Sequence, residues 1–121
     1  MIIFTGICCA ALFAFEILYP WLKKSAGLEI NIKTHKIVGI FAVLAAFLHL
    51  AAAGFPVNFS VGYLLLILFV LTVLSGALIK SLSKYFSGKV LKAGKLLKAI
   101  HVALSIMTAM VLVFHILQEI I

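Results

Sequence analysis

Charged side chains are scarce in this sequence: they make up 11% of its 121 residues, whereas 66% of the residues are hydrophobic. A water-soluble domain of this length needs a larger charged surface, so the composition excludes that class and favours a membrane protein. Acidic residues are scarcer than basic ones, and the formal net charge is +7. This charge does not indicate nucleic-acid binding, because the lysines lie where membrane topology places them.

Cysteine and N-terminal basic residues are also limited. The two cysteines, Cys8 and Cys9, are adjacent. This spacing suits neither a metal site nor a disulfide framework, so we interpret both as packing residues. No lysine or arginine precedes the first apolar run, so we do not expect a cleavable signal peptide and interpret this run as a helix of the protein.

Four apolar runs occupy most of the chain, at residues 2–22, 35–53, 60–79 and 100–117. Each is close to the roughly 20 residues that a helix needs to cross the hydrocarbon of a bilayer. The sequence therefore predicts an all-α fold, a transmembrane four-helix bundle with up-down-up-down topology. We expect one domain covering residues 1–121.

The basic residues are ten lysines that lie in or beside two connections. They are Lys23, Lys24, Lys33 and Lys36 around the first connection, and Lys80, Lys84, Lys89, Lys92, Lys95 and Lys98 in the third. The positive-inside rule predicts that these lysine-rich loops are cytoplasmic and that both termini lie outside, in what we expect to be a prokaryotic plasma membrane. Residues 81–98 mix lysines with apolar side chains such as Phe86, which is typical of an interfacial segment on anionic lipid. A charge cluster that only sets the membrane topology explains the lysines equally well.

Four histidines form two pairs with the same spacing. His35 and His49 are fourteen residues apart in the second run, and His101 and His115 are fourteen apart in the fourth. Fourteen residues advance a helix by about 21 Å and nearly four turns, so both members of a pair lie on one face. On parallel helices the heights match, His35 with His101 near the inside and His49 with His115 near the outside.

Two imidazoles at one height suit haem iron, because the macrocycle supplies four nitrogen ligands and the protein supplies two. The sequence therefore predicts two haems b between the second and fourth helices. His35 and His101 would ligate the inner iron, and His49 and His115 the outer iron. Cys-x-x-Cys-His is absent, which excludes covalent c-type attachment. Lys33, Lys36 and Lys98 lie closest to the inner histidines and are candidates to pair with haem propionates.

Two stripes of residues at seven-residue steps accompany the histidines. The first helix contains Gly6, Phe13 and Pro20, and the third contains Gly62, Phe69 and Gly76. Seven residues are close to two turns, so each stripe lies on one helix face. We interpret the glycines as room for a flat macrocycle and the phenylalanines as filling between two macrocycles, with ordinary packing of small residues as the alternative. The candidate cofactor-binding residues are the four histidines with Gly6, Gly62, Gly76, Phe13 and Phe69.

Glu16 is the only acidic residue inside a predicted span. An ionisable residue within a membrane helix indicates a functional role. Two roles are open: acceptance of a proton from quinol, or pairing with a lysine.

The paired histidines on two parallel helices of four resemble the membrane di-haem b-type cytochromes. The likeness is to the core of the ferric reductase and NADPH oxidase transmembrane domain, to the haem-bearing half of respiratory cytochrome b and, more loosely, to cytochrome b561. It implies that the four histidines are axial ligands and that the chain carries electrons across the membrane. Ferric reductases also have a flavin and nicotinamide domain, which 121 residues do not accommodate. We therefore expect a separate cytoplasmic reductase or a membrane quinol as electron donor.

Iron with two imidazole ligands has no open position, so we predict an electron carrier without catalytic residues, acting alone or as the membrane subunit of an oxidoreductase. Each imidazole should donate its other ring N–H to a backbone carbonyl, typically one turn back. The alternative function is that of a non-haem membrane subunit or adaptor whose histidines relay protons or have a structural role.

Overall fold

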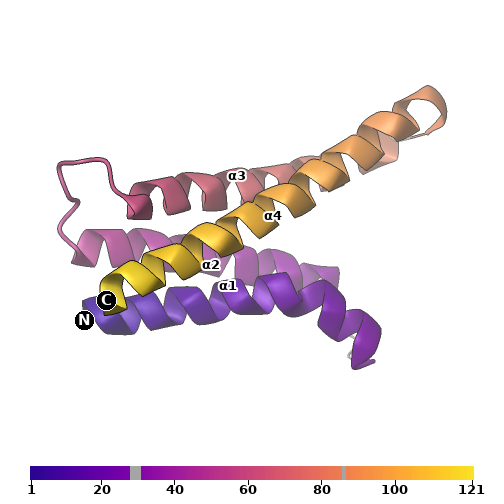
Figure 1. Cartoon of the computed structure of the whole chain (residues 1–121). Coiled ribbons are helices and arrows are strands. Elements are labelled where there is room, and N and C mark those ends of the chain that lie inside the picture. The colour runs from indigo at the N-terminus through magenta and orange to yellow at the C-terminus, as the bar shows by residue number, and fades with distance from the viewer. Residues whose placement is uncertain (28–30, 86) are drawn as a thin grey trace. The chain divides into compact units, whose positions relative to one another are not determined.

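The computed structural model describes residues 1–27, 31–85 and 87–121, and these residues are almost entirely helical (Figure 1). The long helices are α1 (Ile2–Ser25), α2 (Ile32–Ala52), α3 (Val61–Leu82) and α4 (Leu91–Ile120), with two 3₁₀ turns, η1 (Ser83–Tyr85) and η2 (Gly88–Val90), between α3 and α4. No strand occurs within the described ranges. All four long helices have the length and hydropathy needed to cross a membrane. The predicted all-α class is confirmed, and the four apolar helices fit an integral membrane protein.

The helix limits follow the predicted apolar runs except at the start of α4. This helix begins at Leu91 and not at residue 100, so it includes much of the lysine-rich segment 81–98. Leucine, lysine and alanine all favour helix, and hydropathy alone does not register this propensity. Phe86, which we assigned to the same segment, lies outside the described residues.

The chain divides into two compact units, Met1–Leu66 and Ile67–Ile121, and each is described by itself. The expectation of one domain therefore stays a prediction. Unit 1 contains α1, α2 and the first residues of α3, and α1 and α2 lie side by side in Figure 1. The helices are antiparallel, because His49 near the end of α2 contacts the start of α1, whereas His35 near the start of α2 contacts Glu16.

A Schellman motif ends α2. The Gly54 N–H donates to the Ala51 carbonyl, and the Phe55 N–H donates to the Leu50 carbonyl. Gly54 has φ of +81°, a left-handed conformation that glycine adopts without steric cost. The turn satisfies two terminal carbonyls of α2 before the connection to α3.

Few side chains are fully buried in either unit. Phe13 of α1 is 3% exposed and Phe69 of α3 is 4% exposed, so both phenylalanines of the predicted stripes are buried. Cys9 is also buried, which agrees with a packing role. Large apolar side chains are exposed on every long helix, as expected for a surface whose solvent is lipid.

In unit 2, α3 and α4 are antiparallel and joined by polar side chains. Thr72 of α3 lies beside Thr108 of α4, with 3.3 Å between their hydroxyl oxygens. Nearer the end of α3, Ser75 contacts His101, which lies earlier in α4. The arrangement brings the end of α3 against the N-terminal half of α4.

Candidate functional site

His49 of α2 is held at its Nδ1 atom by the first turn of α1. The Nδ1 atom lies 3.1 Å from the Ile2 carbonyl oxygen and 3.1 Å from the Thr5 hydroxyl oxygen. The Thr5 hydroxyl donates its own hydrogen to the Ile2 carbonyl at 2.9 Å. A carbonyl only accepts hydrogen bonds, so Nδ1 of His49 carries the proton and donates it to these two oxygens. In the neutral ring, the lone pair is then on Nε2.

Gly6 lies against the same imidazole. A Cβ atom at this position would be 3.1 Å from Cε1 of His49, closer than ordinary contacts allow. The glycine therefore lets the ring approach the backbone of α1. Ile2, Thr5 and Gly6 together supply a carbonyl, a hydroxyl and a flat backbone surface to one imidazole.

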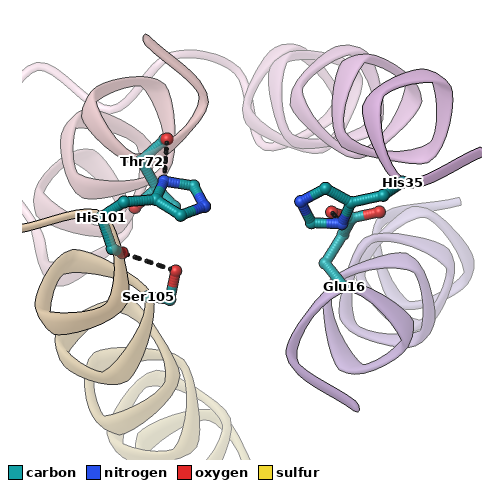
Figure 2. Close-up of polar contacts among 5 residues, drawn as sticks. All are labelled: Glu16, His35, Thr72, His101 and Ser105. Carbon is teal, nitrogen blue, oxygen red and sulfur yellow. Dashed lines mark hydrogen bonds and ion pairs between the residues drawn. The ribbon is translucent and has the colours of Figure 1, made fainter. Parts of the chain in front are cut away.

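The same arrangement occurs in unit 2 around His101 of α4. Its Nδ1 lies 3.0 Å from the Thr72 carbonyl oxygen and 2.8 Å from the Ser75 hydroxyl oxygen (Figure 2 shows the Thr72 contact). Ser75 donates to the Thr72 carbonyl at 2.7 Å, and a Cβ at Gly76 would be 3.1 Å from Cε1 of His101. We call the residues at positions n−3, n and n+1 of each set the carbonyl–hydroxyl–glycine triplet.

The two triplets correct one detail expected from the sequence. The carbonyls that accept the Nδ1 hydrogens of His49 and His101 belong to the neighbouring helix, not to the turn before the histidine. A carbonyl oxygen has two lone pairs, so the Ile2 and Thr72 carbonyls can accept an imidazole N–H from the neighbouring helix in addition to the backbone N–H of their own helix. In both units the triplet contacts Nδ1 and orients the ring.

His35 of α2 has a different partner. Its Nδ1 lies 2.6 Å from Oε2 of Glu16 on α1, and the Tyr19 ring stacks on the imidazole with centroids 4.7 Å apart (Figure 2 shows the Glu16–His35 pair). The side chains of His35 and Glu16 are 24% and 12% exposed. Glu16 therefore contacts an imidazole, a partner that the sequence reasoning did not consider. Its role toward quinol stays a prediction.

Two further predicted site residues, His115 of α4 and Gly62 of α3, are each half-buried. Ser105, one turn after His101, donates its hydroxyl hydrogen to the His101 carbonyl at 2.8 Å (Figure 2). The pairing of His35 with His101 and of His49 with His115 joins one histidine from each unit, and it stays a prediction. Among the described residues, no group of three or more His, Cys, Asp or Glu side chains is arranged to hold a metal ion.

Sequence reasoning identified Gly6 and Gly76 but missed the hydroxyls beside them. The available signal was the Thr5-Gly6 and Ser75-Gly76 dipeptides, each on a helix predicted to face the histidines. The chain matches no protein-family model, no curated protein and no solved structure. Its function must be inferred from these residues.

Proposed function

We propose that this protein carries electrons across a membrane by means of two b-type haems, each ligated by two imidazoles. The paired spacing assigns His35 and His101 to one haem and His49 and His115 to the other. The observation that carries the proposal is the carbonyl–hydroxyl–glycine triplet, which occurs once in each unit and each time on a predicted ligand. When bound, haem supplies reversible one-electron oxidation and reduction of its iron.

The residues of the triplets fit a haem ligand. An imidazole that binds iron needs a free Nε2 lone pair and a fixed ring plane, and its Nδ1–H needs an acceptor. The carbonyls of Ile2 and Thr72 select the tautomer, since each requires a hydrogen on Nδ1. The glycines Gly6 and Gly76 hold the ring against the helix. His49 and His101 thus have an acceptor for the Nδ1 hydrogen and a fixed ring plane.

The buried phenylalanines support the same proposal. Phe13 and Phe69 lie midway along α1 and α3, and both are almost fully buried. Large apolar side chains midway along the helices would exclude water from a space between two bound haems. Gly62 lies in the same stripe of α3 as Phe69 and Gly76, and on this basis we propose it as a haem-contacting residue.

Two imidazoles on each iron leave no open position, so the protein transfers electrons and leaves substrate chemistry to its partners. The donor is a membrane quinol or a cytoplasmic reductase, and the acceptor lies on the opposite side. From the positive-inside rule and the lysines, we expect the connections before α2 and after α3 in the cytoplasm and both termini outside, in a prokaryotic plasma membrane. The chain would serve as the membrane subunit of an oxidoreductase or as a separate carrier.

A second candidate function is proton relay in a non-haem membrane subunit. The pair of Glu16 and His35, with 2.6 Å between Oε2 and Nδ1, favours it, because carboxylate–imidazole pairs inside membranes serve in proton pathways. This function needs no bound chromophore.

The visible spectrum of the purified protein distinguishes the two functions. The electron carrier is expected to be red, with the bands of six-coordinate, low-spin b-type haem that sharpen on reduction by dithionite. A colourless protein that remains folded and takes up no added haem would overturn the electron-carrier proposal and leave proton relay.

A further inference from the structure

The carboxylate of Glu16 distinguishes His35 from the two histidines held by triplets. At His49 and His101 the acceptors of the Nδ1 hydrogen are neutral carbonyl and hydroxyl oxygens. At His35 the group beside Nδ1 is a carboxylate, at 2.6 Å. Three rings of the same type therefore have two electrostatically different supports.

The geometry fixes both the carboxylate and the ring that it contacts. Tyr19, which is buried in α1, stacks on His35 with 23° between the ring planes, so the imidazole is held on one face as well as at Nδ1. The second carboxylate oxygen, Oε1 of Glu16, is buried and makes no hydrogen bond to any residue that the structure describes. The negative charge is thus directed mainly at the imidazole.

A negative charge 2.6 Å from Nδ1 polarises the imidazole and makes Nε2 a stronger electron donor. Stronger donation and a nearby negative charge both stabilise the ferric state of an iron bound at Nε2, relative to the ferrous state. The effect is larger in a membrane than in water, because the low dielectric screens the charge less.

We infer that Glu16 is a positioning residue that acts through His35 and lowers the redox potential of the haem that His35 ligates. The inference rests on the proposed function. Lysines near His35 in sequence, such as Lys33 and Lys36, act in the opposite direction. A substitution of Glu16 leaves these lysines unchanged, so the difference between variant and wild type isolates the carboxylate.

The test is an optical redox titration of the purified, haem-loaded Glu16→Gln variant. Glutamine has nearly the same shape, so the side chain still fills the space beside Nδ1 while the negative charge is lost. We expect the potential of one haem to rise, with about a tenfold higher ratio of reduced to oxidised haem at a fixed ambient potential, or about 59 mV for a one-electron couple. The other haem should keep its potential.

Three controls separate tuning from a general effect of lost charge. Glu119→Gln removes an exposed carboxylate near the end of α4 and should change neither potential. Glu16→Asp keeps the charge but withdraws it from Nδ1, and should give a smaller rise than Glu16→Gln. In a His35→Ala background, Glu16→Gln should leave the potential of the remaining haem unchanged.

The outcomes distinguish this inference from the proposed function. Two haems with wild-type potentials in Glu16→Gln would overturn the inference and leave the electron carrier intact. A wild-type protein without haem would overturn the proposed function itself. Should Glu16→Gln lose a haem, the Glu16→Asp variant decides: a raised potential of one haem supports the inference, and unchanged potentials overturn it.

Discussion

The ends of α2 present two imidazoles with contrasting supports. His49 donates to the neutral oxygens of Ile2 and Thr5, whereas His35 lies beside the carboxylate of Glu16. Neutral acceptors fix the tautomer and orientation of a ring with little effect on its charge. A carboxylate also changes the electron density of the ring. The comparison suggests that orientation is needed at both ends of α2, and electronic tuning only at one.

The support of His49 recurs at His101 because it is a local property of helices. A serine or threonine at position n reaches the carbonyl at n−3 of its own helix, which places two oxygens on one face. Glycine at n+1 removes the Cβ beside them. Three residues within two turns therefore build the same imidazole support on α1 and α3.

The largest expected effect comes from removing the space at a triplet glycine. Gly76→Leu places a Cβ at 3.1 Å from Cε1 of His101 and adds three further carbons, so the ring must leave its position. Overpacking of this kind costs about 1–3 kcal/mol of unfolding free energy. We expect the variant to lose the haem ligated by His101 and to keep the other, as measured by haem content and spectrum. Gly6→Leu should do the same at His49.

The matched control is Ala77→Leu, which adds similar volume on an exposed position next to Gly76. It should bind haem as the wild type does. Normal haem content in both Gly6→Leu and Gly76→Leu would show that these glycines serve ordinary helix packing, and the likeness between the two triplets would have no functional meaning.

A smaller effect is expected from the triplet hydroxyls. Thr5→Val and Ser75→Ala each remove one of two acceptors of an Nδ1 hydrogen and leave the carbonyl in place. Loss of such a support weakens metal binding by about 10-fold or more. Competition for haem with a soluble apoprotein measures this, and Ser83→Ala, which removes an exposed hydroxyl bonded to the Lys80 carbonyl, is the control. Equal affinities in all three variants would count against the triplets.

The smallest effect is expected away from the histidines, at Thr108 of α4. Its hydroxyl donates to the Leu104 carbonyl and that of Thr72 donates to the Leu68 carbonyl, both at 2.7 Å, so the bond between the two threonines competes with these. Thr108→Val should therefore cost only about 0.6 kcal/mol, without any change in the haem spectrum. Unfolding in detergent measures the cost. A loss of more than about 2 kcal/mol of unfolding free energy would show that the Thr72–Thr108 pair contributes strongly to the stability of unit 2.

The sequence predicted the helices because hydropathy reports the membrane directly. It placed the start of α4 too late, since the lysines of residues 91–98 lower hydropathy without disfavouring helix. The glycine stripes were found by periodicity, and Gly6 and Gly76 do lie on the faces that meet histidines. Periodicity does not show which group lies against these glycines. The imidazoles of His49 and His101 lie there, in the space that we assigned to a macrocycle.

The supports of the histidines were less predictable than the histidines themselves. Serine and threonine are common at contacts between membrane helices, so Thr5 and Ser75 could be recognised only from the glycine that follows each of them. Glu16 was recognised as functional because it is ionisable and lies within a span. Its contact with His35 depends on how α1 and α2 pack, and the spacing of residues within one helix does not contain that information.

The most direct test of the account is the ratio of haem to protein chains in the wild type and in the His35→Ala and His49→Ala variants. The account predicts two haems per chain in the wild type and one in each variant, with different spectra or potentials for the two remaining haems. A wild-type ratio of one or none would contradict the central claim. Loss of both haems in either variant would contradict two independent sites.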